Sequence, residues 1–240
     1  MASPVKACVA EAIGTFALCF IGGGAICMTT LQGSAGAGLL GVAMAHGLIL
    51  SIAVSATMNV SGGHLNPAVT VVMLVTKRIG GADGAKYIIS QLVGGTIAGL
   101  LLLAVFDGLD VDGSTEKVVD AAKLGTPAFS FISARVAVLV EILLTFLLVF
   151  AIFGTAVDPR APKIGGFGIG LTIAADILMG GPLTGAAMNP ARTFGTGIVA
   201  ALSGNLDVFW AQHWVYWVGP IAGAILAGVL YDKCVMERDG

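Results

Sequence analysis

The sequence predicts an all-α membrane protein with six transmembrane helices, two re-entrant half-helices and an inverted internal repeat. Three observations predict this fold. First, 57% of the 240 residues are hydrophobic and 11% are charged, which is too apolar for a soluble surface. Second, several apolar stretches are long enough to cross a bilayer. Third, an Asn-Pro-Ala triplet occurs twice, at positions 66–68 and 189–191. We therefore expect a single membrane domain over residues 1–240.

Six segments have the length and apolar character of membrane-spanning helices, which need about 20 residues to cross a hydrocarbon core of about 30 Å. The 35 glycines fit such a bundle, because small residues allow transmembrane helices to approach one another closely. The first segment contains Glu11 and lacks a basic leader, so we interpret it as a retained helix rather than a signal peptide. The segments are expected at about residues 7–30, 39–60, 86–106, 135–157, 164–183 and 208–231.

Each Asn-Pro-Ala triplet is expected to begin a helix that is too short to span. Asparagine is a preferred helix N-cap and proline a preferred first helical residue. The helices should run from Pro67 to about Thr76 and from Pro190 to about Ser203. They would be roughly 15 and 21 Å long. Two half-helices in matching halves of a membrane protein indicate a site at the bilayer midplane, faced by their positive N-termini.

The two halves of the chain resemble each other. The stretch Glu11–Phe16 (EAIGTF) recurs as Glu141–Phe146 (EILLTF). We place repeat one at about residues 7–106 and repeat two at about 135–231, with a long extracellular connection at about 107–134. Each repeat holds an odd number of spanning helices, so the second must enter the membrane from the opposite face. The two half-helices would therefore approach from opposite sides and meet.

Basic residues predict the orientation, because cytoplasmic loops carry an excess of lysine and arginine. With six alternating helices, one side collects most of these residues, and we expect it to be cytoplasmic together with both termini. On the other side, the acidic stretch Asp107–Asp120 is expected to be a solvated, mobile loop. The basic residues on the predicted cytoplasmic side are Lys6, Lys77, Arg78, Lys86, Arg160, Lys163, Lys233 and Arg238.

Two longer stretches carry a resemblance to a known family. Ser61–Thr70 (SGGHLNPAVT) together with Met188–Arg192 (MNPAR) resembles the aquaporin, or major intrinsic protein, family over nearly the whole chain. Thr155–Pro159 (TAVDP), Gly180–Pro182 (GGP) and His213–Pro220 (HWVYWVGP) are most similar to the plant tonoplast intrinsic proteins. The resemblance implies the aquaporin fold, a pore through each subunit and a homotetramer.

The asparagines of the two triplets are the expected centre of the pore. Each would cap its half-helix through the side-chain oxygen and point its amide hydrogens into the pore, where one water oxygen could accept from both. As in aquaporin-type pores generally, two positive helix ends would oppose cations and protons but not neutral water. An ordinary capped turn explains one triplet, but not two at matching repeat positions. The triplet residues are Asn66, Pro67, Ala68, Asn189, Pro190 and Ala191.

A selectivity constriction is expected around Arg192. This residue follows the second triplet in a loop that must dip into the membrane, where an arginine is costly unless it serves a pore or a partner. The resemblance implies that His46, Ile177 and Ala186 complete the constriction. This quartet matches the tonoplast type, and we expect relaxed selectivity from it. The competing interpretation of His46 is a hydrogen-bonded core histidine.

Other polar residues within the apolar segments need an interpretation. His64 is expected to line the cytoplasmic half of the pore, to bond to loop backbone, or to do both. Glu11 and Glu141 suggest a proton relay, but we favour a structural role in which they accept hydrogen bonds from the re-entrant loops. Asp176 stands where relatives usually carry asparagine, and a protonated acid, a subunit contact and a tuned pore remain open. Phe129 replaces a filter histidine of some relatives, which argues against a filter widened for ammonia.

The predicted function is passive, bidirectional water conduction with permeability to small neutral solutes such as ammonia, urea, hydrogen peroxide and glycerol. The first alternative is a facilitator chiefly for glycerol, urea or ammonia, although Thr193 replaces the aspartate typical of glycerol facilitators. The second is an intramembrane hydrolase with Ser61 as nucleophile and His64 or His46 as base, which leaves the second triplet unexplained. The third is an ion-coupled transporter, which would need carbonyls or acids that bind ions at the midplane.

Partners and location follow from the same features. The expected partners are water, small neutral solutes, the lipid bilayer and further copies of the chain, with no nucleic acid. Neither a metal nor another cofactor is expected, since the four cysteines show no metal-binding spacing and no disulfide framework. We expect a multi-pass integral membrane protein rather than an enzyme. The cell membrane is the favoured location, with the vacuolar membrane as the alternative.

Overall fold

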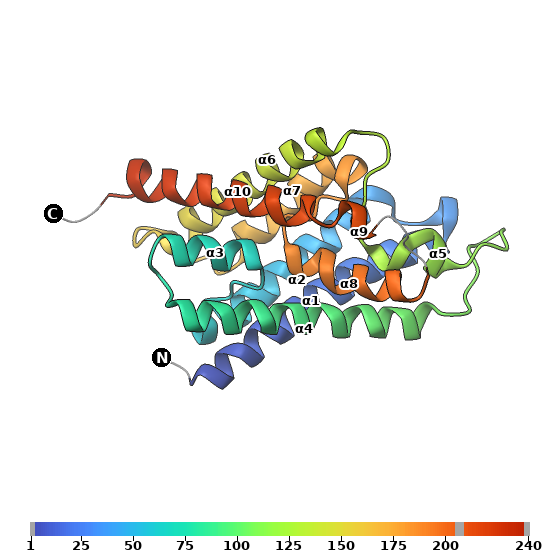
Figure 1. The fold of residues 1–240 in the computed structure, drawn as a ribbon, viewed down its shortest axis with the longest axis horizontal. Coiled ribbons are helices and arrows are strands. Elements are labelled where there is room, and N and C mark those ends of the chain that lie inside the picture. Colours follow the sequence, from blue (N-terminus) through green and yellow to red (C-terminus); the bar gives the residue numbers. More distant parts are fainter. Residues whose placement is uncertain (1–2, 205–208, 238–240) are drawn as a thin grey trace.

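A computed structural model describes residues 3–204 and 209–237. Within that part of the chain, six helical stretches are long and apolar enough to cross a membrane, and they run along one common axis (Figure 1). This confirms the predicted fold class. The helices are α1 Pro4–Leu31, α2 Gly38–Ser61, α3 Pro67–Val75, α4 Gly81–Phe106, α5 Val118–Ala122, α6 Ala134–Ile152, α7 Phe167–Thr184, α8 Pro190–Leu202, α9 Phe209–Gln212 and α10 Val215–Leu230, and short helical turns lie at Gly33–Ala35, Lys123–Gly125, Phe153–Val157 and Tyr231–Val235.

The boundaries of the spanning helices differ from the expected ones mainly where a helix extends beyond the apolar stretch. Helix α4 begins at Gly81 rather than at residue 86. Its first turn is polar, and Lys86 pairs there with Asp83 at 3.0 Å, so hydropathy alone did not reveal it. Val208, the first residue of the expected sixth span, and Arg238 lie outside the described residues.

The half-helices α3 and α8 enter the bundle from opposite ends, and their first residues lie near each other midway along it (Figure 1). Helix α1 packs against α2 and α4, whereas α6 packs against α7 and α10, so corresponding helices have corresponding neighbours. Helix α8 lies so close to α4 that a Cβ atom on Gly195 would overlap the carbonyl carbon of Gly95. Glycine at this position permits the close approach.

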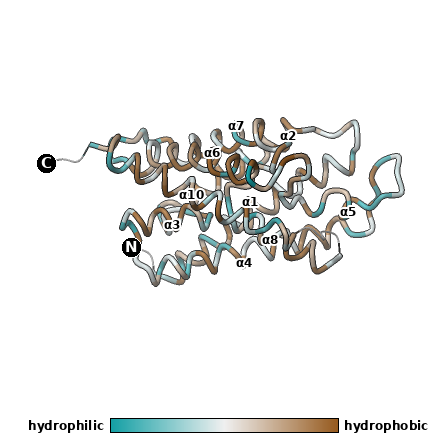
Figure 2. The backbone as a smooth tube through the Cα atoms, turned by 45° about the horizontal axis from the view of Figure 1, so that its top comes forward, coloured by the Kyte–Doolittle hydropathy of each residue, from teal (hydrophilic) through white to brown (hydrophobic). Residues whose placement is uncertain are grey.

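The outer surface of the bundle is apolar along its length. Figure 2 shows hydrophobic residues along the helices and hydrophilic residues in the loop beside α5. Many large aliphatic side chains are exposed, a pattern that soluble monomers rarely show over a contiguous surface and that suits contact with lipid. They include Val9, Ile13, Leu48, Ile52, Ile89, Leu100, Leu139, Leu143 and Leu226.

The connection between the two halves is exposed over most of Asp107–Asp120, as expected, but Val118 and Val119 within this stretch are buried. Its tip is exposed, and Lys117 pairs there with Asp110 at 2.6 Å. The chain then turns inward, and Val118 and Leu124 have no exposed surface. Their side chains enter a cluster with residues of α1, α4 and α8, because burial of these apolar groups outweighs solvation of the charges nearby. The connection is therefore partly a wall of the bundle.

A charged cluster lies at the end of the bundle where α1 begins and α10 ends, and it consists of Arg78, Asp158, Arg160, Asp232 and Glu237. Arg78 pairs with Asp232 at 2.7 Å. Arg160 pairs with Asp158 at 2.7 Å and with Glu237 at 2.9 Å. The Arg160 guanidinium and backbone N–H both donate to Asp158, which lowers the pKa of that carboxyl to about 2. The cluster ties the chain beyond α10 to the α6–α7 loop.

This cluster is expected to resist mild acid. Because the folded pKa of Asp158 lies below its ordinary value of 3.8, its stabilising contribution is present above about pH 4 and is lost as the pH falls towards 2. A spin label on the exposed Cys234 should therefore report unchanged mobility between about pH 5 and 8. Asp158→Asn should increase that mobility throughout this range. A wild-type transition between these pH values would contradict the assignment.

Candidate pore and constriction

The two half-helices begin as expected at their asparagine caps. The side-chain oxygen of Asn66 accepts from the backbone N–H of Ala68 at 2.8 Å. That of Asn189 accepts from Ala191 at 3.0 Å and from Arg192 at 3.3 Å. Pro67 and Pro190 are the first helical residues. The helices end at Val75 and Leu202, close to the expected ends.

Each asparagine also bonds to the opposite re-entrant loop. Asn66 Nδ2 donates to the carbonyl of Met188 at 2.8 Å, and Asn189 Nδ2 donates to that of Leu65 at 2.9 Å. Leu65 and Met188 have left-handed backbone conformations, with φ of 52° and 50°. One hydrogen of each amide joins the two loops, and one remains for a solute.

Glu11 lies behind the first loop and accepts hydrogen bonds from several of its groups. Its carboxylate accepts from Ser61 Oγ at 2.6 Å, from the backbone N–H of His64 at 2.9 Å and from that of Leu65 at 2.6 Å. Gln91 Nε2 donates to it at 2.7 Å. These contacts favour the structural interpretation of Glu11 over a proton relay.

Glu141 has the corresponding position behind the second loop. It accepts from Thr184 Oγ1 at 2.7 Å, from the backbone N–H of Ala187 at 3.0 Å and from that of Met188 at 2.8 Å. Glu141 has no exposed surface, so these loop amides are satisfied by protein where lipid could not satisfy them. As with Glu11, the contacts favour a structural role.

Several supporting residues were missed in the sequence. Tyr87 Oη donates to the carbonyl of Ser61 at 3.0 Å, and Tyr216 Oη donates to that of Thr184 at 2.8 Å. These tyrosines occupy matching places in the two repeats, and this match was the available signal. Gln91 is fully buried within α4, and a glutamine inside an apolar span was a second signal.

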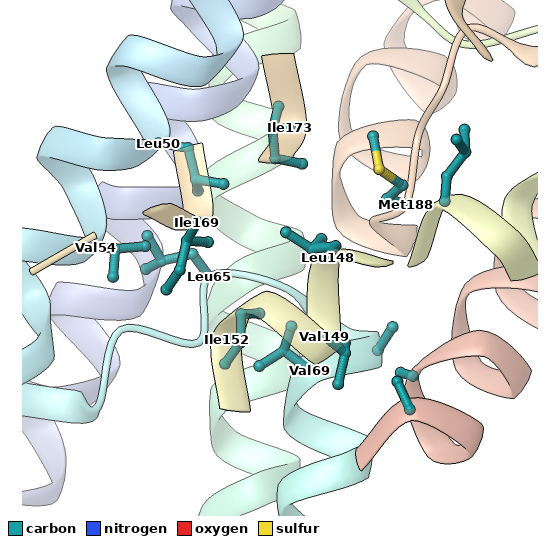
Figure 3. Packing of buried hydrophobic residues seen from close by; sticks show 14 of the residues in the cluster. Leu50, Val54, Leu65, Val69, Leu148, Val149, Ile152, Ile169, Ile173 and Met188 are labelled. Carbon is teal, nitrogen blue, oxygen red and sulfur yellow. The ribbon is translucent and has the colours of Figure 1, made fainter. Parts of the chain in front are cut away.

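A cavity of about 230 Å³ runs beside the two asparagines, which both line it. Figure 3 shows Val54 of α2 and Ile169 of α7 near Leu65, and Ile152 of α6 near Val69, with Met188 to the right of this group. The labelled residues that also line the cavity are Leu50, Val54, Val69, Leu148, Ile152, Ile169, Ile173 and Met188. His64 also lines this cavity, and its Nδ1 lies 3.1 Å from Thr70 Oγ1. The wall is therefore largely apolar, with polar groups concentrated near the asparagines.

A second cavity, of about 420 Å³, lies on the side of the connecting segment and is lined by Lys123 and Thr126 among others. Among the described residues, His46, Ile177 and Arg192 line both cavities. These side chains therefore lie at the boundary between the two spaces. Ala186, the fourth expected member of the constriction, lines the first cavity. The fold thus brings together residues that lie far apart in the sequence.

His46 and Arg192 contact each other directly at this boundary, and we call the side chains of His46, Ile177 and Arg192, together with Ala186 beside them, the constriction ring. His46 Nε2 accepts from Arg192 Nε at 3.2 Å and Nη2 at 2.9 Å, while His46 Nδ1 donates to the carbonyl of Val42 at 2.8 Å. These bonds require a neutral imidazole with its hydrogen on Nδ1. Arg192 is 4% exposed, and its Nη1 has no hydrogen-bond partner in residues 3–204 and 209–237. This buried Nη1 is therefore a donor without a protein partner in that part of the chain.

A family model described as "Major intrinsic protein" matches residues 1–231. The chain belongs to the major intrinsic protein family. It is 43% identical to "Aquaporin TIP4-4" of Zea mays over 98% of the chain and 89% of that protein. It is 39% identical to "Probable aquaporin TIP3-2" of Arabidopsis thaliana over 97% of the chain and 84% of that protein. These relatives confirm the resemblance to the tonoplast intrinsic proteins.

A solved structure shares the fold of this member of the major intrinsic protein family. The aquaglyceroporin from Plasmodium falciparum superimposes with a TM-score of 0.85 over 97% of each chain, at 24% sequence identity. At this identity the likeness establishes the aquaporin fold alone.

Asp176 and Phe129, which the sequence analysis expected to depart from the tonoplast type, lie outside the linings of both cavities of this major intrinsic protein. Asp176 is 4% exposed, and its Oδ2 has no hydrogen-bond partner within the described residues. Phe129 packs against the Tyr216 ring at 6.4 Å between centroids. Its backbone N–H and carbonyl bond to Gln212. Neither side chain contributes to the ring of His46, Ile177 and Arg192.

Proposed function

We propose that the protein is a passive water channel that also admits small neutral solutes. One observation carries this proposal: His46, Ile177 and Arg192 lie at the boundary between the second cavity and the first cavity, which both cap asparagines line. The names of the relatives support it, since they are aquaporins. The family consists of channels rather than enzymes, so flow follows the osmotic or solute gradient without a chemical step.

Water would pass the midplane by bonding to the asparagines. The remaining amide hydrogen of Asn66 and that of Asn189 can both be accepted by one water oxygen, which leaves the hydrogens of that water to bond along the pore. The positive N-termini of α3 and α8 meet at the same place and raise an electrostatic barrier to cations and protons. The apolar walls provide few competing hydrogen bonds, so water is not held elsewhere.

Selectivity would be set at the ring of His46, Ile177, Ala186 and Arg192. The positive charge of Arg192, which lines both cavities, opposes cations. His46 is smaller than an aromatic residue such as phenylalanine or tryptophan, and Ile177 and Ala186 offer no hydrogen bond. Such a ring is wide and partly apolar, which suits solutes such as urea or glycerol in addition to water.

The competing functions are less well supported. Ser61 Oγ donates to Glu11 at 2.6 Å and accepts from the Gly63 N–H, so it is engaged in the loop rather than free as a nucleophile. Glu11 and Glu141 lie behind the re-entrant loops and outside both cavity linings, which removes the acids that an ion-coupled transporter would need in its path. A facilitator chiefly for glycerol, urea or ammonia is not favoured by the names of the relatives.

Assembly and location belong to the same proposal. We infer a homotetramer in a lipid bilayer. Both termini would lie on the cytoplasmic side, because the basic residues gather at that end of the bundle. The relatives carry names of the tonoplast type, which supports a vacuolar membrane, whereas the sequence alone favoured the cell membrane. Fractionation of the host membranes distinguishes the two locations.

Stopped-flow light scattering on proteoliposomes tests the function. Wild type should shrink quickly under an impermeant osmolyte and reswell under glycerol and urea. His46→Phe should abolish reswelling but retain fast shrinkage, because the larger ring narrows the constriction and removes the acceptor for Arg192. His213→Phe changes a histidine outside both cavity linings and should behave as wild type. Reswelling that survives His46→Phe would refute the role of this ring.

A further inference from the structure

Two threonine hydroxyls join the connecting segment to Arg192, whose guanidinium group lies in the constriction. Thr126 Oγ1 donates to Thr196 Oγ1 at 3.0 Å, and Thr196 Oγ1 donates to the carbonyl of Arg192 at 3.1 Å. We call these two bonds the hydroxyl relay. Thr126 is 9% exposed and Thr196 is 1% exposed. Hydrogen bonds shielded from water in this way hold their geometry better than exposed ones.

The segment that presents Thr126 is itself held in place. Leu124 is fully buried and has a left-handed conformation with φ of 52°, which persists only where the surroundings determine it. Gly125 lies against α1, where an added Cβ atom would lie 2.5 Å from the Cα of Gly23. Beyond Thr126, Gln212 bonds to the backbone N–H and carbonyl of Phe129 at 3.1 and 2.7 Å. Thr126 is thus presented from a rigid frame.

The hydroxyl relay is not repeated at the matching position of the first half-helix, whose Thr70 Oγ1 instead donates to the carbonyl of Asn66. The position that matches Thr196, counted from the cap asparagine, is Met73, whose side chain cannot donate a hydrogen bond. A half-helix of this type therefore forms without the relay. What distinguishes the second half-helix is Arg192, since the matching residue of the first is Val69. The hydroxyl relay therefore occurs in the half of the chain that carries Arg192, the positively charged residue of the constriction.

We propose that Thr126 is a specificity-determining positioning residue for the channel. Through Thr196 it fixes the first turn of α8, and that turn sets where the Arg192 guanidinium lies beside His46. Thr126 also lines the second cavity, so it acts on the side of the constriction that faces this cavity. The inference rests on the proposed channel function and extends the constriction to the connecting segment.

The test compares hydroxyl deletions at neighbouring positions. Thr126→Val keeps the shape of the side chain and removes the donor, while Thr126→Ser keeps the donor. Thr193→Val is the matched control, because Thr193 Oγ1 is buried in the same half-helix and has no hydrogen-bond partner within the described residues. Proteoliposome permeabilities for water, glycerol and urea are measured for each variant. A general loss of folding would lower all of them together.

Thr126→Val should raise the ratio of glycerol or urea permeability to water permeability about two- to tenfold, the range expected from one net hydrogen bond. Thr126→Ser and Thr193→Val should keep the wild-type ratio. Thr196→Val breaks the relay from its other end and should raise the ratio as well, which decides the matter if Thr126→Val does not fold. Unchanged ratios in both relay variants would overturn the inference. A wild type that conducts no water would overturn the channel function instead.

Discussion

Glu141→Gln is expected to lower the water permeability of each folded channel by about tenfold or more. The carboxylate accepts from Thr184 Oγ1, Ala187 N–H and Met188 N–H. A glutamine must place its NH₂ group against at least one of these donors, and a buried unsatisfied donor costs about 1–3 kcal/mol. The carbonyl of Met188 also holds Asn66, so a displaced loop disturbs both cap asparagines. A free-energy change of about 1.4 kcal/mol corresponds to a tenfold effect.

Asp176→Asn provides the control for this substitution. Asp176 is also a buried acid of the bundle, but its Oδ2 accepts no hydrogen bond from the described residues. The same acid-to-amide change should therefore leave water permeability close to wild type. Stopped-flow shrinkage, normalised to the folded protein in each preparation, measures both variants. Equal permeabilities for Glu141→Gln and Asp176→Asn would show that the carboxylate of Glu141 does not hold the second loop.

Gly195→Ala is expected to destabilise the bundle strongly, although it adds a single methyl group. The added Cβ atom would overlap the carbonyl carbon of Gly95 and would lie 2.5 Å from its Cα. These are backbone atoms of α4, so no side chain can move aside and the helices must separate. Overpacking typically costs about 1–3 kcal/mol. The midpoint of thermal unfolding in detergent should fall by roughly 5 °C or more, with a smaller monodisperse fraction on size exclusion.

Gly81→Ala is the matched control in the packing partner. Gly81 begins α4, and apart from Gly81 itself, its chain neighbours and the nearby backbone of α4, no heavy atom of the described residues lies within 4 Å of an added Cβ atom. The midpoint should stay at the wild-type value or rise slightly, since alanine favours helix over glycine. A stable Gly195→Ala protein with wild-type permeability would mean that α4 and α8 are not packed as closely as described.

Local features of the sequence predicted the elements well. Asn66 and Asn189 cap their helices because the side-chain oxygen of asparagine reaches the next turn whatever the rest of the chain does. The half-helices end near the residues expected, and the six spans follow from apolar length alone. The repeat of Glu11 as Glu141 correctly indicated that both acids occupy the same kind of place.

Contacts between distant residues could not be predicted in the same way. The bond from Asn66 to Met188, and that from Arg192 to His46, join residues from opposite halves of the chain. The sequence predicted the exposed acidic stretch of the connecting segment, but it did not show that Val118 and Leu124, at and just beyond the end of this stretch, are buried. Nothing local indicates which apolar residues of a charged segment will find a partner surface.

Hydropathy, repeat and capping act over short stretches of chain. They were therefore enough to place this protein in a membrane, to divide it into two inverted halves and to give each half a capped half-helix. They could not say which hydrogens of Asn66 and Asn189 remain free, how His46 orients Arg192 or where Thr126 touches α8. Those properties depend on directions and distances between elements, which are set by the packing of the whole bundle.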